Sequence, residues 1–238
     1  MLGALFFPKG TKKNPIPFDS LYIPYIYKEI YLDSVYVDIV NDKKDMVIMD
    51  VGANIGVVTQ YLRDFAKKLY AIEPSSEHYE ALVKNKEFNE WDNVETFNLA
   101  LADSDGEMDF SVNEGNRTMN TLVIGDEVKD RTYKVKGTDF VMQTHKPYKQ
   151  GLKVKTMRFD TFMEENKIFE VDFCKFDVEG AEDMILRSEG FKKVAPRIKA
   201  IEVEFHYPNW QELVNYMIGL GYTARRYDCS AIVILFTR

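Results

Sequence analysis

The feature that most constrains the fold of this chain is a short apolar run that ends in two closely spaced glycines. Residues 46–49 read Met-Val-Ile-Met, a continuous apolar segment typical of a strand buried in a parallel sheet. The sequence Asp50-Val-Gly-Ala-Asn-Ile-Gly56 follows directly, and a helix is predicted over about 57–67. Gly52 and Gly56 let the backbone turn sharply and let another group approach it closely. The segment therefore predicts a strand, a tight loop and a helix in succession.

The same alternation of strand and helix continues along most of the chain. Short apolar runs predict four further strands, at residues 69–72, 94–101, 171–176 and 198–205. Helices are expected between them and after the last one, at about 76–88, 181–189 and 209–220. A closing hairpin is expected from two final segments, 222–226 and 231–236. This order predicts a doubly wound α/β sheet that is mostly parallel and carries one antiparallel strand.

Two segments depart from this alternation and suggest the domain organisation. Residues 1–45 form a lead-in, in which a proline-rich stretch precedes a helix over 26–41, although 36–40 also suits a strand. Residues 46–238 form the main domain, interrupted at about 106–157 by a polar insert with β-prone pieces. The insert is either a solvated decoration or a lid over a substrate, because long loops in compact domains are often functional.

Composition narrows the class of protein. The 238 residues carry a formal charge of −7, which disfavours indiscriminate binding of nucleic acid. Cys174 and Cys229 lie in apolar runs, so reduced, buried thiols in a cytoplasmic protein are favoured over a disulfide. The longest later apolar run, 231–236, is far shorter than the ~20 residues of a membrane span, and 1–7 lacks the features of a signal peptide.

The loop at 50–56 favours one class of cofactor. Glu73 ends the next predicted strand, about 20 residues after Gly52, where an acid in such a unit binds ribose hydroxyls. Asn54 stands where a dinucleotide-binding loop has its second glycine. Asp50 would repel a pyrophosphate but attract the ammonium and sulfonium of S-adenosylmethionine. S-adenosylmethionine is therefore favoured over NAD or FAD, with a purely structural turn as the alternative.

Three motifs resemble one family. They read Asp50-Val-Gly-Ala-Asn-Ile-Gly56, Asn98-Leu-Ala-Leu-Ala-Asp103 and Lys175-Phe-Asp-Val-Glu-Gly-Ala-Glu182. From about Met46 to Phe205 the chain resembles the FkbM family of S-adenosylmethionine-dependent methyltransferases. The resemblance implies the class I methyltransferase fold, a Rossmann-like, seven-stranded, mostly parallel sheet with helices on both faces. It also implies O-methylation of a hydroxyl on a sugar, glycan or related natural product.

The resemblance also assigns cofactor contacts. It gives the methionine part of S-adenosylmethionine to Asp50, Gly52, Asn54 and Gly56. It gives the ribose to Glu73, and the adenine to Pro74, Ser75 and the backbone around Ala100 and Leu101. Many class I methyltransferases carry an acid for the adenine amine at the end of the third strand. Here that position is Ala100, and the acid Asp103 comes slightly later.

Candidate catalytic residues follow the two later central strands. Asp177 and Glu179 end the strand at 171–176, at the edge where open α/β sheets bind ligands. Asp177 is a candidate for a place beside the transferring methyl group, and Glu179 for orienting or deprotonating the acceptor. Their alternative role is to complement a helix N-terminus. Strand alternation places Glu204 and His206, together with Glu202, on one face of their strand.

His206 is the predicted general base, since histidine accepts protons near neutral pH. The alternative is a satisfied surface histidine with no catalytic role, and no role is assigned to His78 or His145, which are predicted to be exposed. Asp177, Glu179 and Glu204 can supply oxygen ligands to Mg²⁺, but metal-free transfer is favoured.

Two other functions stay open, an NAD(P)-dependent oxidoreductase and an inactive S-adenosylmethionine-binding module. The acceptor is expected to be a small molecule or glycan and not a nucleic acid, and Asn116–Thr121 in the insert is predicted to contact it.

Overall fold

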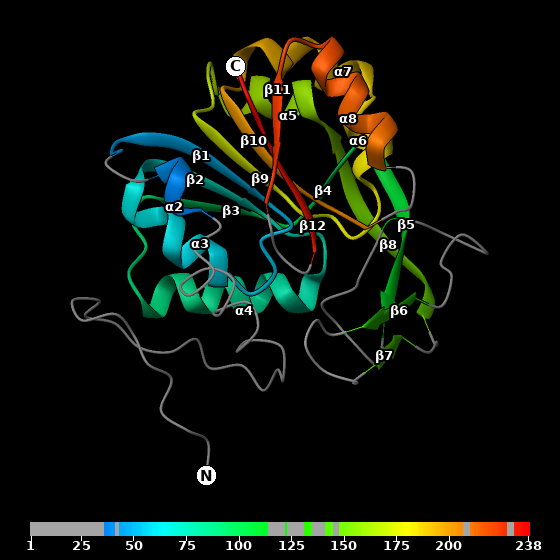
Figure 1. Cartoon of the computed structure of the whole chain (residues 1–238). Helices are drawn as coiled ribbons and strands as arrows, with labels where there is room; N and C mark the ends of the chain where they lie inside the picture. Colours follow the sequence, from blue (N-terminus) through cyan, green and yellow to red (C-terminus); the bar gives the residue numbers. More distant parts are fainter. Residues whose placement is uncertain are drawn as a thin grey trace.

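The computed structural model describes residues 36–40, 43–113, 122, 131–134, 141–144, 148–206, 210–227 and 231–238. A seven-stranded sheet lies at its centre (Figure 1). In spatial order its strands are β11 (Thr223–Arg226), β12 (Ile232–Thr237), β10 (Ala200–Phe205), β9 (Phe173–Phe176), β1 (Met46–Val51), β2 (Ala66–Ile72) and β3 (Val94–Phe97). Neighbouring strands run parallel except that β12 is antiparallel to both β10 and β11. The predicted mostly parallel sheet with one antiparallel strand is confirmed.

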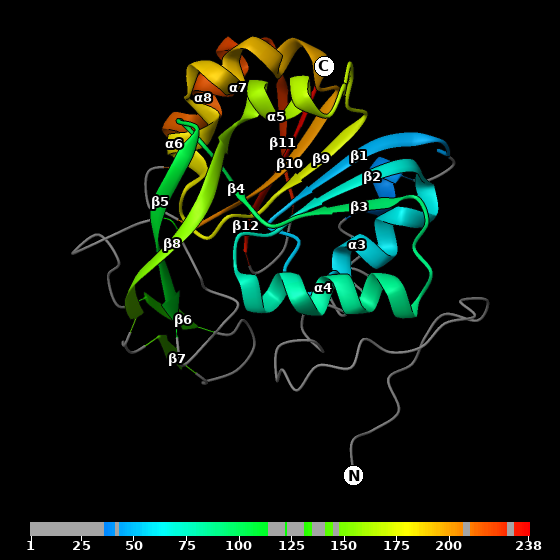
Figure 2. The ribbon, with the colours of Figure 1, turned by 180° about the vertical axis from the view of Figure 1, so that it is seen from behind.

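Helices cover both faces of this sheet, as Figures 1 and 2 show from opposite sides. One layer contains α2 (Val37–Val40), α3 (Val57–Leu62) and α4 (Ser76–Phe88). The other contains α5 (Phe159–Glu165), α6 (Glu182–Leu186), α7 (Glu189–Val194) and α8 (Trp210–Gly219). Each layer packs on its own apolar cluster, because successive side chains of a strand point to opposite faces. The central strands are therefore apolar on both faces, which explains their uninterrupted hydrophobic runs.

Two of the predicted helices are shorter than the sequence indicated. The helix expected at 57–67 ends at Leu62, and a 3-10 turn (Arg63–Phe65) leads into β2, which begins at Ala66. Ala66 pairs with Met46 at the start of β1, so pairing in the sheet overrides the local helical pattern. The helix expected at 181–189 is interrupted at Ser188, whose hydroxyl accepts a hydrogen bond from the amide of Phe191 and begins α7.

The strand predicted at 94–101 is two strands in different sheets. β3 ends at Phe97, and β4 (Ala100–Ala102) leaves the main sheet to pair with β8 (Tyr148–Arg158). Asn98 occupies the break, where its side-chain amide donates hydrogen bonds to the carbonyls of Glu73 and Pro74. The interruption is therefore fixed by side-chain hydrogen bonds to the neighbouring loop, which apolar patterning does not reveal.

The insert forms an arm beside the main sheet. β5 (Gly106–Asn113) runs antiparallel to β8, and with β4 they make a three-stranded sheet. A separate two-stranded pair, β6 (Arg131–Lys134) and β7 (Val141–Thr144), lies near the far end of the arm (Figures 1 and 2). Asn116–Thr121, the predicted acceptor contact, lies outside the described residues, as do His145 and the first residue of the helix expected at 209–220.

The described residues include one of the two cysteines predicted to be buried, reduced thiols. Cys174 is a buried free thiol, whereas Cys229 lies outside the described residues. None of the helices described is long and apolar enough to cross a bilayer.

Candidate active site

A cavity opens at the carboxyl ends of the central strands, where open α/β sheets bind ligands. It contains about 570 Å³ of space that protein atoms do not fill, and this volume includes open solvent. Its polar walls come from the ends of β1, β2 and β9 and from α4, through Gly52, Asn54, Glu73, His78, Asp177 and Glu179. Apolar walls come from the region of β4 and from the arm, including Leu101 and Phe110.

The two glycines of the loop serve different packing needs. Gly52 has φ +79°, and a Cβ there would lie 1.8 Å from the carbonyl oxygen of Asp177. Gly56 has φ +93°, and its Cβ would lie 2.7 Å from Leu82 and 3.0 Å from Trp91. Gly52 thus lets the loop approach the end of β9, and Gly56 lets it pack against α4 and the residues that follow.

Glu73 joins the first two loops of the cavity. It is 5% exposed, and its carboxylate accepts hydrogen bonds at 2.8 Å from the backbone amides of both Asn54 and Ser75. Each carboxylate oxygen has a further lone pair, so both can accept another hydrogen bond. Glu73 is therefore held rigidly at the cavity wall and retains the capacity to bind a ligand hydroxyl.

Seven of the ten residues predicted to contact a cofactor line the cavity: Gly52, Asn54, Glu73, Pro74, Ala100, Leu101 and Asp177. The other three, Asp50, Gly56 and Ser75, are buried and do not line the cavity. Asp50 is fully buried and accepts a hydrogen bond of 2.6 Å from the hydroxyl of Thr59. Burial raises the pKa of the Asp50 carboxyl, against the opposing effect of Lys175. Asp103 is exposed and does not line the cavity.

His78 was read from the sequence as exposed, and this was wrong. It is 3% exposed, lines the cavity and lies with Nδ1 3.8 Å from Oε1 of Glu73. Ser75 caps α4 by accepting a hydrogen bond from the amide of His78, which places His78 in the first turn of the helix. That position, directly after a strand that ends at the ligand-binding edge, is the signal that would have identified it.

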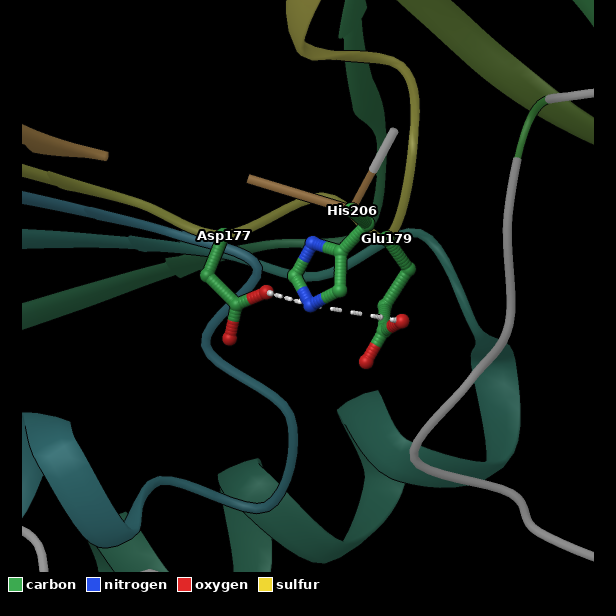
Figure 3. A group of neighbouring side chains, drawn as sticks. All are labelled: Asp177, Glu179 and His206. Carbon is green, nitrogen blue, oxygen red and sulfur yellow. Dashed lines mark ion pairs between the residues drawn. The ribbon is translucent and has the colours of Figure 1, made fainter. Parts of the chain in front are cut away.

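His206 stands at the centre of a cluster of carboxylates from the ends of β9 and β10. Its Nε2 atom lies 3.8 Å from Asp177 Oδ1, 3.6 Å from Glu179 Oε2 and 3.5 Å from Glu204 Oε1. Figure 3 shows the ring between Asp177 and Glu179. These two acids line the cavity, whereas His206 and Glu204 contact them from the neighbouring strand. The structure thus brings together all four predicted catalytic residues.

Burial and the neighbouring charges in the cluster shift the pKa values of His206 and Glu179. Burial lowers the pKa of His206, but Glu179 and Glu182 outweigh burial and hold that pKa well above its ordinary value. The pKa of Glu179 is raised to about 8, mainly by burial and further by Asp177, against the opposing effect of His206. Strong perturbation at the mouth of a cavity is typical of sites that transfer protons.

Two residues of the third motif complete the site and were not predicted. Glu182 is fully buried, and its Oε1 lies 2.9 Å from Nδ1 of His206, which orients the ring and directs Nε2 to Asp177 and Glu179. Lys175 is buried beside Asp50 and Asp177. Glu182 ends a dense run of charged residues that follows an apolar strand, and Lys175 is a charged residue within that strand. These places in the sequence were the available signals.

The same cluster has the ligand types of a cation site. One ligand atom from each of Asp177, Glu179 and His206 lies within 4.8 Å of the others. Oδ1 of Asp177 is also buried and accepts no hydrogen bond from any residue that the structure describes. The cluster can therefore bind a metal ion, or a donor group of an organic ligand, at this atom.

Comparison with known proteins decides the family. Residues 50–225, well over half of the chain, match the domain described as "Methyltransferase FkbM domain". The chain belongs to the methyltransferase FkbM family. This FkbM-family chain is 27% identical over 181 residues to "Methyltransferase 1" of Beauveria bassiana (strain ARSEF 2860), covering 72% of this chain and 69% of that protein. It is 29% identical over 177 residues to "Methyltransferase sdnD" of Sordaria araneosa, covering 68% and 67%.

Solved structures share the fold of this FkbM-family protein. The methyltransferase FkbM from Methylobacillus flagellatus KT superposes with a TM-score of 0.54 at 12% identity, covering 86% of this chain and 46% of that one. An rRNA methylase from Streptococcus thermophilus gives a TM-score of 0.51 at 11% identity, covering 88% and 95%. At these identities the likeness concerns the fold, and it confirms the predicted class I methyltransferase architecture.

Proposed function

We propose that this protein transfers a methyl group from S-adenosylmethionine to a hydroxyl of a sugar, glycan or related natural product. The observation that carries the proposal is the contact of His206 with Asp177 and Glu179, two carboxylates that line the same cavity as Glu73. An alkyl hydroxyl is a poor nucleophile until its proton is being removed, so O-methyl transfer needs a base at this place. Bound S-adenosylmethionine would supply an electrophilic methyl group on a sulfonium.

The residues of the cavity fit this cofactor. Glu73 would accept hydrogen bonds from the ribose hydroxyls with its remaining lone pairs. Oδ1 of Asp177, buried and without a hydrogen bond from the described residues, suits a donor or cationic group of the methionine part. Gly52 and Asn54 would border that part, and the segment around Ala100 would border the adenine. In this proposal the remaining candidates, Asp50, Gly56 and Ser75, shape the cavity from behind.

The proposed chemistry divides the cluster into roles. Glu179, on the cavity wall, orients the acceptor hydroxyl, and His206 Nε2 takes its proton as the oxygen attacks. Glu182 holds Nδ1 and stabilises the imidazolium that forms, in the way that a carboxylate supports a catalytic histidine. Asp177 and Glu204 add negative charge beside the ring and make it a stronger base. Alignment of the hydroxyl with the methyl group supplies most of the rate enhancement.

The pH dependence of kcat/KM is expected to show the raised pKa of His206. Only neutral imidazole accepts a proton, so kcat/KM should rise with pH along a limb whose apparent pKa exceeds about 6.5. Glu179→Gln removes an anion that raises this pKa, so the limb of the remaining activity should move to lower pH. Initial rates across the neutral and alkaline range test this. An unmoved limb in the variant would contradict the assignment of the base.

Metal removal is expected to leave activity intact. In the proposed chemistry the neutral imidazole of His206 takes the proton of the acceptor, and this step needs no metal ion. Dialysis against EDTA should therefore change kcat by less than about twofold, a change below ~0.5 kcal/mol in activation free energy. Loss of turnover that added Mg²⁺ restores would show instead that Asp177 and Glu179 hold a metal.

The test of the function is binding followed by product analysis. Calorimetry should show binding of S-adenosylhomocysteine and none of NADH, which separates methyl transfer from the oxidoreductase alternative. Incubation with a panel of sugars and glycans should then give a methylated species by mass spectrometry. Binding of S-adenosylhomocysteine with no product from any acceptor pool would favour an inactive cofactor-binding module. An RNA pool tests the prediction that nucleic acid is not the acceptor.

A further inference from the structure

Lys175 is a buried cation that the proposed chemistry leaves without a role. It lies in β9 and is 4% exposed. The register of the sheet pairs it with Asp50 of β1 on one side and Glu202 of β10 on the other. Lysine is almost never buried unless it is paired, so these neighbours explain how the charge is tolerated. They do not explain why a cation is needed at this place.

The tip of the side chain contacts two parts of the site at once. Its Nζ donates a hydrogen bond of 2.7 Å to the carbonyl oxygen of Gly52 and lies 3.3 Å from Oδ2 of Asp177. It lies further from Asp50, at 3.6 Å from Oδ1. A buried ion pair that served stability alone would need only Asp50. The shorter contacts instead run to the loop at the cavity and to the carboxylate beside His206.

These contacts fix two geometries that transfer depends on. Because Oδ2 of Asp177 faces Lys175, the other carboxylate oxygen faces His206 Nε2 at 3.8 Å (Figure 3). The hydrogen bond to Gly52 holds the loop carbonyl where the backbone lies against Asp177, directly after β9. One ammonium group thus sets the spacing between the wall that would hold the methyl donor and the residues that would activate the acceptor.

We propose that Lys175 is a positioning residue that fixes the Gly52 loop and the Asp177 carboxylate relative to each other. The proposal rests on the function proposed above, since it concerns the alignment of donor and acceptor. Misplacement by about 1 Å costs on the order of 100-fold in rate, so a side chain that never touches substrate can control turnover.

The role of Lys175 is tested by adding its substitution to a variant in which one of its buried carboxylate partners is already neutral. Lys175→Met alone leaves buried carboxylates without their cation and can unfold the protein. Asp50→Asn therefore provides the background, because it removes one buried carboxylate and keeps an acceptor for Thr59. The test variant is Asp50→Asn with Lys175→Met. Lys199→Met is the matched surface control, since Lys199 pairs with Asp172 and Glu170 and is more than half exposed.

Three measurements are compared: urea unfolding, calorimetric affinity for S-adenosylhomocysteine, and kcat with KM for the acceptor. Relative to Asp50→Asn, the double variant should bind S-adenosylhomocysteine about tenfold more weakly, as expected for a lost charged hydrogen bond. Its kcat should fall about 100-fold while the acceptor KM changes by less than about threefold. Lys199→Met should match wild type.

Two outcomes would overturn the proposal. One is a folded double variant that equals Asp50→Asn in affinity and in kcat. The other is a double variant that does not fold, which would assign Lys175 a purely structural role. Failure of the wild type to methylate any hydroxyl would refute the proposed function, but the affinities for S-adenosylhomocysteine would still test the contact of Lys175 with the loop.

Discussion

His206→Gln is expected to lower kcat by about 10²–10⁴-fold, the usual contribution of a positioned general base. Glutamine keeps much of the ring's volume and can still donate to Glu182, but it cannot take a proton from the acceptor. Affinity for S-adenosylhomocysteine should stay within about threefold of wild type, because the cavity wall does not include His206. Initial rates with saturating acceptor and calorimetry measure the two effects separately.

Glu182→Gln tests the support of the same histidine and is expected to have a smaller effect than His206→Gln. The amide keeps a group within reach of Nδ1 but removes the charge that stabilises the imidazolium, so kcat should fall by about 10- to 100-fold, as for supporting residues in other sites. The urea midpoint checks that each variant is folded. A folded His206→Gln with kcat within about tenfold of wild type would exclude His206 as the base.

Gly52→Ala is expected to destabilise the protein by at least about 2 kcal/mol and to abolish measurable binding of S-adenosylhomocysteine. A Cβ at this position would lie 1.8 Å from the carbonyl oxygen of Asp177, and the backbone φ of +79° is itself unfavourable for alanine. The loop must therefore move away from β9, which breaks the hydrogen bond from Lys175 to the Gly52 carbonyl. Urea unfolding and calorimetry measure both losses.

Gly219→Ala is the control for this substitution. Gly219 ends α8, its φ is not positive, and a Cβ there would meet no atom within 4 Å. The variant should be as stable as wild type or more stable by up to about 1 kcal/mol, because alanine favours helix more than glycine does. Equal stability of Gly52→Ala and Gly219→Ala would show that the loop does not need the close approach to β9.

The sequence was sufficient for the order of strands and helices and for most of the cavity wall. Apolar runs such as 46–49 report burial on both faces, and the acids that follow central strands meet at one edge by the geometry of a parallel sheet. Asp177, Glu179, Glu204 and His206 come together for this reason. The family motif added the identity of the loop, which spacing alone left open.

The features that escaped prediction depend on contacts between distant segments. Whether His78 faces solvent or the cavity depends on how α4 packs. The sequence of α4 is only weakly amphipathic, so it does not indicate which face of the helix is buried. The break after Phe97 depends on Asn98 reaching back to the carbonyl of Glu73. Lys175 sits in a strand that otherwise reads as apolar, and only the register shows that Asp50 lies beside it. Local periodicity contains none of this information.

Because β4 leaves the main sheet, the cavity has one wall from the seven-stranded sheet and another from the arm. The groups proposed to hold the ribose and methionine parts of the methyl donor come from the edge of the seven-stranded sheet, whereas Phe110 and Leu122 bring the arm to the same cavity. Glu73 is braced by Asn54 and Ser75, and neither belongs to the arm. Substitutions between 106 and 157 can therefore reshape one wall while the hydrogen bonds that brace Glu73 remain. In such a chain the arm side of the cavity can change while the proposed ribose contact at Glu73 stays in place.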